Sequence, residues 1–468
     1  MRIRYIRFLA LGASLLGAGS TQAAAQHPAH DPRPAAEPDS TLRGHVSDAP
    51  PAADTANAPA ALAAPEERAM WMQPLGRGWR VGAMGQVFPI VTSGSPSNSD
   101  LPIHDTELYA TQPAAMLTLG SPDQVVVLRT TLDFEAWTQP GGELTFGGWG
   151  EGFIDKRHPH TLLHEATLSL NGWDLPGGAG SLTIGKGFVP FGTEDPMSRP
   201  VAKYPTNHHL SQVLERWMVA GVYLLRSGLS LEASVFGGAE PTDAHDLSNL
   251  DGFGESFGAR LTQRIGDGGL MAPWEVSASW AHVEQEHDGT LEATELYNAA
   301  VRHNGRYKDV NVYVLVEGSR SEPEGREGYW STLAEARLGF GRHRPYYRFE
   351  YATRPEYERE GLAGTTGFYR YDHDAHPVGA SRWQIHTLGY EVDTGSPRFA
   401  ARPFVEVQYN QVTHENGEFN PVVAFGDDRF WSVSTGFKIF LGGDAMRMGT
   451  YGVLDPMANA MRPAQHQH

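Results

Sequence analysis

The sequence predicts an all-β fold: a transmembrane, antiparallel, up-and-down β-barrel of about 16 strands. Three observations lead to this fold class: short segments in which apolar and polar residues alternate, short turns that alternate with long loops, and a composition rich in glycine and aromatic residues. The chain of 468 residues contains 53 Gly, 20 Phe, 17 Tyr and 11 Trp. Its mean hydropathy is negative, which is too polar for a bundle of membrane-spanning helices.

The first residues have the organisation of a secretory signal peptide. Three arginines within the first seven residues precede an apolar run from Phe8 to Gly19, and small residues follow at Ala23-Ala24-Ala25. A retained transmembrane helix would need about 20 apolar residues, which this run does not supply. We therefore predict that residues 1–25 form a signal peptide that is cleaved near Ala25.

The character of the chain changes twice after the signal peptide. Residues 26–70 are dominated by Ala, Pro and Asp and are poor in aromatic residues, which predicts a disordered periplasmic segment. Aromatic residues, glycines and short alternating segments then recur through residues 71–442, which we predict to be a single outer-membrane β-barrel domain. Residues 443–468 are expected to form a C-terminal tail or an additional strand, with 447–454 as the candidate for that strand.

Alternation with a period of two residues is the main evidence for strands that separate lipid from water. In residues 429–440, Trp431 and Phe437 lie on one face of the predicted strand, and Ser434 and Lys438 lie on the other. Charged residues inside such strands would be costly in a dry core but suit a wet lumen. The same alternation predicts strands within residues 124–134, 162–171, 215–225, 229–237, 274–284, 310–318, 345–351 and 402–410.

Turn residues separate these segments in a way that also favours a barrel. Short turns are predicted at 226–228 and 266–269, whereas long loops are predicted at 91–112, 138–160, 187–213, 238–254, 354–381 and 411–428. Outer-membrane barrels combine tight periplasmic turns with larger external loops, and this length of chain holds an even number of about 14 to 18 strands. A soluble propeller or sandwich would also contain short Gly-rich strands, but no repeat of fixed period is present, and the aromatic faces favour lipid.

The charge and the cysteine content exclude several classes of function. The formal net charge is −18, which argues against nucleic acid as a partner because phosphate neutralisation needs a basic surface. The chain has no cysteine, which excludes a lipid-attachment cysteine, disulfides, thiolate catalysis and cysteine-based zinc sites. Attraction of cations remains compatible with this charge.

One short motif resembles a known family. Residues 185–192, Gly-Lys-Gly-Phe-Val-Pro-Phe-Gly, follow the predicted strand 181–184 and lead into a long loop. The motif and its context are similar to the G-K-x-x-x-P-F-G signature of phosphate-selective porin O and P type outer-membrane porins. The resemblance covers about 30 residues, and it implies a general diffusion or solute-selective channel that assembles as a homotrimer.

Two features depart from that family. Its members usually end on an aromatic residue of the last strand, whereas here Phe440 is followed by a further 28 residues. No ladder of lumen-facing arginines is evident in the sequence either, so the resemblance does not extend to phosphate selectivity.

The loop that begins after the motif contains many polar residues. If it folds into the lumen, it would narrow the pore and set selectivity through its fixed charges, whereas as an external loop its charges would contact only water. The mixture of both signs predicts no strong ion preference. The candidate constriction residues are Lys186, Glu194, Asp195, Arg199, Lys203, His208 and His209.

Histidine and methionine near the chain ends suggest an alternative function. Imidazole binds Zn, Cu and Ni, and thioethers suit Cu(I), so an outer-membrane metal-binding or metal-transport protein is the alternative hypothesis. No spacing among the 20 histidines is a strong metal motif, and scattered surface histidines are the commoner explanation. The candidate metal ligands are His27, His30, His466 and His468, with Met446, Met448, Met457 and Met461 as candidates for Cu(I).

Catalytic chemistry finds less support. A barrel-embedded hydrolase would need a nucleophile, a base and an orienting acid, and no G-x-S-x-G elbow occurs in the sequence. We therefore predict a protein that is not an enzyme and needs no cofactor. The expected function is that of a Gram-negative outer-membrane porin, in which small hydrophilic solutes or ions diffuse passively through a water-filled lumen and lipid surrounds the barrel.

Overall fold

The computed structural model describes most of the chain from Trp71 onward. Every described residue belongs to one compact unit. The expected signal peptide (1–25) and the expected disordered segment (26–70) lie outside the described residues. The described residues are 71–95, 106–138, 161–193, 198–206, 208–213, 215–239, 241, 245–247, 250, 252–287, 290–357, 377–396, 398–418, 420–422, 427–443 and 448–462.

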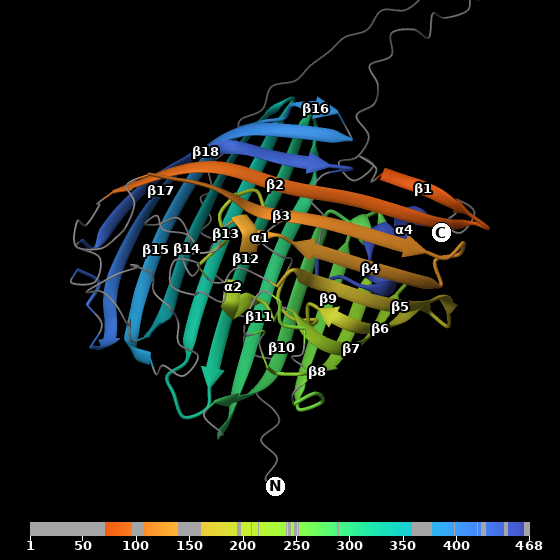
Figure 1. Cartoon of the computed structure of the whole chain (residues 1–468), viewed down its shortest axis with the longest axis horizontal. Coiled ribbons are helices and arrows are strands. Elements are labelled where there is room, and N and C mark those ends of the chain that lie inside the picture. Colours follow the sequence, from red (N-terminus) through yellow and green to blue (C-terminus); the bar gives the residue numbers. More distant parts are fainter. Residues whose placement is uncertain are drawn as a thin grey trace, which may run out of the picture. The chain divides into compact units, whose positions relative to one another are not determined.

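Antiparallel strands close into a ring within the described part of the chain, and their number is 16, as expected (Figure 1). The ring closes where β18 pairs with β2, with Val433 opposite Ser93. Two shorter strands are added to it: β1 (Trp71–Gly76) pairs with β2, and β16 (Gly395–Ser396) pairs with β17. The strands of the ring are β2 (Trp79–Ser95), β3 (Thr106–Gly120), β4 (Val126–Asp133), β5 (Leu163–Leu175), β6 (Gly178–Gly187), β7 (Arg216–Leu225), β8 (Leu229–Phe236), β9 (Ser256–Ile265), β10 (Trp274–His287), β11 (Thr290–Tyr307), β12 (Val310–Pro323), β13 (Tyr329–Phe340), β14 (His343–Tyr357), β15 (Pro377–Val392), β17 (Phe399–Gly417) and β18 (Arg429–Leu441).

Short connections join the strands at one end of the ring and most of the long ones lie at the other, as predicted, although β10 and β11 are joined there by only two residues and β12 and β13 by five. The short turn at 226–228 joins β7 to β8, and the turn predicted at 266–269 begins the connection 266–273 between β9 and β10. Several strands run further than the alternation indicated, so that β2 ends at Ser95, β14 at Tyr357 and β17 at Gly417, inside predicted loops. The physical reason is that ladder hydrogen bonds continue along an antiparallel pair whether or not the side chains still alternate.

The predicted alternation of side chains is confirmed. On β18, Trp431 and Phe437 point outward with exposed fractions of 53% and 49%, whereas Ser434 and Lys438 point inward with 0% and 3%. Each segment singled out by alternation lies within a strand and passes its ends by at most two residues. Alternation did not single out β2, β3, β9, β11, β13 and β15, although on β9 Leu261 and Ile265 face outward while Arg260 and Arg264 face inward.

Aromatic residues mark two levels on the outer face. On β11, Tyr297 and Tyr307 lie ten residues apart, and on β13 Trp330 and Phe340 have the same separation. At about 3.3 Å per residue and a tilt of about 40°, ten residues span about 25 Å along the barrel axis. That is the height of the apolar band between the two aromatic girdles of an outer-membrane barrel.

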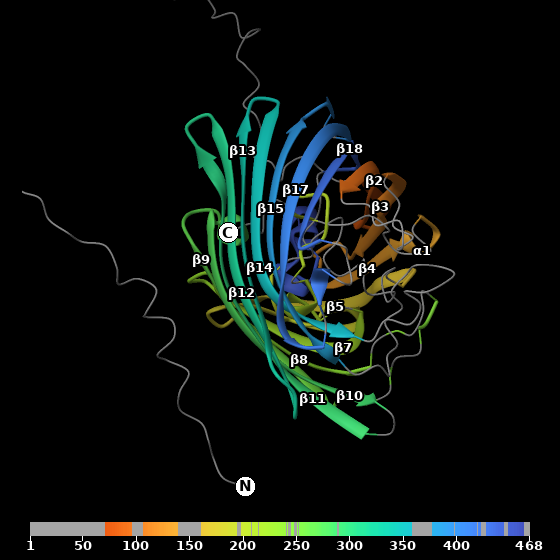
Figure 2. The same cartoon turned by 90° about the vertical axis from the view of Figure 1, so that its left-hand side faces the viewer.

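The wall of the barrel is uneven in height. The strands β4 to β9 have 8 to 13 residues, whereas the long strands on the other side of the ring reach 18 residues in β11 and 19 in β17 (Figure 2). The helical elements are short, namely α1 (Glu135–Thr138), α2 (His208–Ser211), η4 (Gly269–Met271), η5 (Gly452–Leu454) and α4 (Pro456–Met461). Among the described residues, none of the helices is long and apolar enough to cross a membrane.

Candidate functional site

The loop between β6 and β7 lies inside the ring, and we call its described residues within 188–213 the inner segment. Its Gly192 N–H donates to Oγ of Ser279 on β10 over 2.8 Å. Its Thr206 N–H donates to Oε2 of Glu350 on β14 over 2.6 Å. A single segment can reach both of these inward-facing side chains only through the interior of the ring. Of the two arrangements considered from the sequence, the loop therefore adopts the one inside the lumen.

The glycines of the 185–192 motif allow close approaches that other residues would prevent. A Cβ on Gly187 would lie 2.4 Å from the hydroxyl oxygen of Tyr451. Gly192 has a φ of +68°, and a Cβ there would lie 1.6 Å from the carbonyl oxygen of Ser211. Glycine tolerates both the positive φ and the close contact, so the motif lets the chain turn from β6 into the lumen.

Lys186 stands at the base of the inner segment and is fully buried. Its Nζ donates to Oγ1 of Thr161 over 2.8 Å, and that threonine donates in turn to Oε1 of Glu215 over 2.9 Å. The same carboxylate oxygen lies 2.7 Å from Nδ1 of His164. The network joins both ends of the inner segment to β5, so Lys186 holds the segment in place.

The other two described constriction candidates, Arg199 and Lys203, are also buried. Arg199 forms an ion pair with Glu317 on β12, with 3.1 Å between Nη2 and Oε2. Lys203 donates from Nζ to Oγ of Ser432 on β18 over 2.9 Å, and its carbonyl oxygen accepts from Nη1 of Arg348 over 2.9 Å. These cations fix the inner segment to two separate parts of the wall, β12 and β18.

The remaining constriction candidates are described only in part. Glu194 and Asp195 lie outside the described residues. His208 and His209 belong to α2, of which the backbone is described.

Wall carboxylates also satisfy backbone groups of the inner segment. Oε1 of Glu406 on β17 accepts from the N–H of Ala202 over 2.8 Å and from the hydroxyl of Tyr346 over 2.7 Å. The Ala202 carbonyl oxygen accepts from Nε2 of Gln112 on β3 over 3.0 Å. Because buried backbone groups need partners, these inward-facing residues make the segment part of the folded interior.

A second stretch of chain also fills the lumen, and we call residues 448–462 the tail plug. Its Gly449 carbonyl oxygen accepts from Nη2 of Arg260 on β9 over 2.8 Å, and its Met461 carbonyl oxygen accepts from Nη1 of Arg80 on β2 over 2.8 Å. These residues form η5 and α4, so the additional strand considered for 447–454 is not formed in its described part. Tail residues such as Leu454 and Met457 are buried there, which favours docking over extension into solvent.

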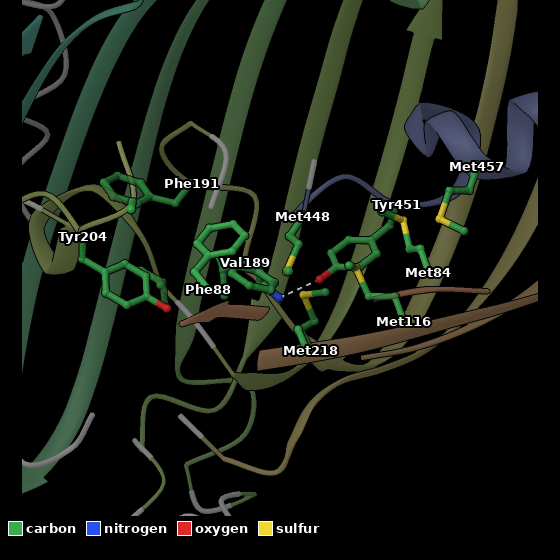
Figure 3. Packing of buried hydrophobic residues seen from close by; sticks show 14 of the residues in the cluster. Met84, Phe88, Met116, Val189, Phe191, Tyr204, Met218, Met448, Tyr451 and Met457 are labelled. Carbon is green, nitrogen blue, oxygen red and sulfur yellow. Dashed lines mark hydrogen bonds between the residues drawn. The ribbon is translucent and has the colours of Figure 1, made fainter. Parts of the chain in front are cut away.

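The inner segment and the tail plug share an apolar cluster inside the ring (Figure 3). Phe188 and Val189 of the inner segment and Met448 of the tail plug belong to it, together with Met84 and Met218 from the wall. The core of this molecule therefore lies within the lumen, between two segments that are not part of the barrel wall.

A small polar cavity of about 30 Å³ lies between the two segments and the wall strands β8 to β11. Arg260 pairs with Glu232 at 2.7 Å, and Glu275 pairs with Arg302 at 2.7 Å and with Arg264 at 3.2 Å. Sequence reasoning missed these residues. The alternation along β9 was the signal that could have found two of the arginines. Contrary to the expectation from the sequence, Arg260 and Arg264 both face the lumen from this strand.

Five of the eight metal candidates lie outside the part of the chain that the structure describes. They are His27, His30, His466, His468 and Met446. Within the described ranges, no three His, Asp or Glu side chains are arranged to hold a metal ion. Met448, Met457 and Met461 are buried in the lumen.

Comparison with known proteins gives a likeness to solved structures alone. No protein-family model matches the chain, and no curated protein sequence matches it. An anion-selective porin from Comamonas acidovorans is 12% identical, covering 78% of this chain and 100% of that chain, with a TM-score of 0.46. A loop L8 deletion mutant of OmpT, an outer membrane protein of Vibrio cholerae, is 12% identical, covering 78% of this chain and 99% of that chain, with a TM-score of 0.45. OmpF of Salmonella typhi, in a complex with daunomycin, is 12% identical, covering 78% of this chain and 98% of that chain, with a TM-score of 0.43.

Proposed function

We propose that this protein is an outer-membrane porin through which small hydrophilic solutes or ions diffuse passively. The observation that carries the proposal is the cavity of paired charges inside the closed ring, lined by Arg260, Arg264, Arg302, Glu232 and Glu275. A water-filled path needs polar side chains within and apolar ones outside, and the wall has both. The proposed activity needs no catalytic residue and no cofactor.

The proposed path runs along the β8–β11 side of the lumen. On the opposite side, the inner segment is held against β14, β17 and β18 by Glu350, Glu406 and Ser432. In this proposal Lys186, Arg199 and Lys203 position the segment that narrows the pore, while the three arginines of the cavity face the solute. Glu194, Asp195, His208 and His209 remain constriction candidates.

We expect a weak preference for anions. Three arginines and two glutamates line the cavity, so one positive charge is left uncompensated locally, although the whole chain has a net charge of −18. Selectivity depends on the charges nearest the path, because salt at about 0.15 M screens exposed charges beyond about 8 Å.

The test is conductance of the refolded protein in planar lipid bilayers, with reversal potentials under a salt gradient. Discrete steps are expected, and Arg302→Gln is expected to move the reversal potential towards cations. Arg320→Gln is the matched control, since Arg320 lies on the outer face with 60% of its side chain exposed. A folded protein without conductance, in all forms tested, would rule out the porin.

Location and assembly belong to the same proposal. We propose export by the predicted signal peptide, insertion into the outer membrane of a Gram-negative bacterium, and assembly as a homotrimer. The aromatic levels at Tyr297 and Tyr307, about 25 Å apart, support insertion into a bilayer. Membrane fractionation tests the location, and the mass of the protein in detergent solution tests the trimer.

The second candidate function is the handling of a soft metal ion. The observation in its favour is that Met84, Met116, Met218, Met448 and Met457 belong to one cluster inside the lumen (Figure 3). Thioethers are ligands for Cu(I), although methionines also fill irregular apolar interiors. The test is a Cu(I) titration of the full chain against a variant that lacks residues 26–68 and 443–468. Equal affinity of the two proteins for Cu(I) would show that the terminal residues do not bind the metal.

A further inference from the structure

We propose that the tail plug is an autoinhibitory element: residues 448–462 occupy the lumen at its short-turn end and reduce the conductance of the pore. This inference rests on the proposed porin function and adds a control device to it. Four observations carry it, namely the course of the tail, its polar contacts, the apolar patch beneath it, and its link to the inner segment.

The tail crosses the ring from one side to the other. It leaves the wall at the end of β18, and its Gly449 carbonyl oxygen accepts a hydrogen bond from Arg260 on β9. Because β9 is the eighth strand round the ring from β18, these two strands lie on opposite sides of a barrel of 16 strands. The chain then returns, and Met461 contacts Arg80 at the start of β2.

The wall provides polar partners that match the tail. The Thr450 carbonyl oxygen accepts from Nη1 of Arg129 over 3.2 Å, and Oδ2 of Asp455 lies 3.7 Å from the same nitrogen. The N–H of Val453 donates to Oγ of Ser181 over 3.3 Å. A Cβ on Gly452 would lie 1.9 Å from that same Oγ, so the tail approaches the wall more closely here than any other residue type allows.

The wall beneath the tail is apolar where a water-filled channel would be polar. Met84 on β2, Met116 on β3 and Met218 on β7 face the lumen and are nearly completely buried (Figure 3). On β17, by contrast, the inward positions include Gln408 and Asn410. Inward-facing methionines would be costly to hydrate, so their presence on several strands indicates a surface that is built to be covered.

The tail plug lies at the end of the barrel that has the short turns. Arg80 is the second residue of β2, and Ser181 lies near the start of β6, next to the turn at 176–177. The inner segment is its neighbour within the lumen, because the N–H of Phe188 donates to the hydroxyl of Tyr451 over 2.8 Å. In outer-membrane barrels the short turns are periplasmic, so the plug would close the pore from the periplasmic side.

The first experiment compares the full chain with a variant that ends at Gly443. Both are refolded, their β-sheet content is compared by circular dichroism, and unitary conductance is measured in planar bilayers. The truncated barrel is expected to conduct roughly twofold or more better, because only the inner segment then narrows a lumen that is wide enough for an aqueous channel. A folded truncated barrel with unchanged conductance would overturn the proposal.

A matched pair of substitutions tests the plug in the full chain, in case the truncation impairs folding. Ala458 and Ala460 both lie on α4, but Ala458 is fully buried and Ala460 is exposed. Ala458→Asp places a charge in the docked interface and is expected to raise conductance as truncation does. Ala460→Asp is expected to behave like the unmodified protein, and equal conductance of the two variants would contradict docking.

Thiol labelling tests docking of the tail plug without measuring conductance. It therefore distinguishes failure of this inference from failure of the porin proposal. The chain has no cysteine, so Met457→Cys creates a single thiol at a position with 3% exposure. This thiol is expected to resist a water-soluble reagent, and to react once Ala458→Asp is added. Labelling as fast as that of Ser396→Cys, on the exposed short strand β16, would show that the tail is not docked.

The combinations of outcomes are distinct. If the full chain does not conduct and the truncated barrel does, the result supports both the porin proposal and the autoinhibitory role of the tail plug. If neither protein conducts, the porin proposal fails, and with it any role of the tail in conduction. Protection of the Met457→Cys thiol then still decides whether the tail is docked.

Discussion

The backbone N–H of Phe188 donates a hydrogen bond to the hydroxyl of Tyr451 over 2.8 Å, across 263 positions of sequence. The same hydroxyl donates to Oε1 of Glu165 on β5 over 2.8 Å. One phenol thereby joins the inner segment, the tail plug and the barrel wall. We therefore expect the inner segment and the tail plug to lose their order together.

Removal of this hydroxyl should loosen both segments. Tyr451→Phe leaves the buried N–H of Phe188 without this partner, and an unsatisfied buried donor costs about 1–3 kcal/mol. Urea unfolding in detergent is expected to show that loss, and the Met457→Cys thiol should become more reactive. Tyr307→Phe, on the outer face with 68% exposure, is the control and should change neither quantity. Equal effects of the two substitutions would refute a special role for Tyr451.

The motif glycine beside this phenol gives a second prediction. Gly187→Ala would place a Cβ 2.4 Å from the Tyr451 hydroxyl oxygen, so the ring must move and the tail plug should be displaced. We expect a folded barrel with raised conductance. Gly221→Ala on β7 is the matched control, because a Cβ there meets nothing within 4 Å. Unchanged conductance for Gly187→Ala would show that the tail tolerates the contact.

Acidification should favour the docked tail. Burial raises the pKa of Asp455, with Arg129 opposing the shift and Glu165 adding to it. The docked state therefore binds a proton more tightly than the undocked state, and its relative stability is lost as the pH rises through the raised pKa. As the pH falls from neutral towards the ordinary range of an aspartate, conductance is expected to decrease.

Two substitutions isolate this effect. Asp455→Asn should flatten the pH dependence, because the group that titrates on docking is then absent. Asp123→Asn should leave it unchanged, since Asp123 lies in the turn between β3 and β4, where a hydrogen bond from Ser121 lowers its pKa. Identical pH profiles for the unmodified protein and Asp455→Asn would assign the effect to other groups.

The ion pair between Arg199 and Glu317 should contribute strongly to the inner segment. Both side chains are fully buried and 3.1 Å apart, and removal of one partner from a buried pair costs about 3–5 kcal/mol. Arg199→Ala is therefore expected to lower the free energy of unfolding by about that amount. The comparison is Arg320→Ala, which breaks an exposed pair with Glu322 and should cost less than about 1 kcal/mol. A similar small loss for both would mean that the inner segment is held by its other contacts.

Sequence reasoning succeeded where one face of a strand differs consistently from the other. Trp431, Val433 and Phe437 alternate with polar residues on β18, and the strand was predicted with its inward and outward faces. It failed on β13, where Ala334 and Ala336 face outward and Leu333 faces inward, so that little contrast remains. Alternation is weak evidence for any single strand when small residues occupy the outer face.

The candidate site was predicted in part. The motif at 185–192 directed attention to Lys186, Arg199 and Lys203, and the structure places all three in the lumen as buried anchors. The cavity arginines Arg260 and Arg302 were missed. Alternation along β9 could have indicated Arg260, but the pairing of Arg302 with Glu275 depends on the register between β10 and β11, which local spacing does not give.

The sequence by itself determined the all-β class and the barrel, because alternation and turn composition are local properties of the chain. The length of the chain gave an expected range of 14 to 18 strands, and the structure has 16 in its ring. Only the tertiary structure decided that the loop after β6 and the residues after β18 both turn inward. That choice depends on contacts such as Phe188 with Tyr451 and Arg129 with Asp455, which lie hundreds of residues apart. Contacts of that separation arise from the closure of the ring, and no local pattern encodes them.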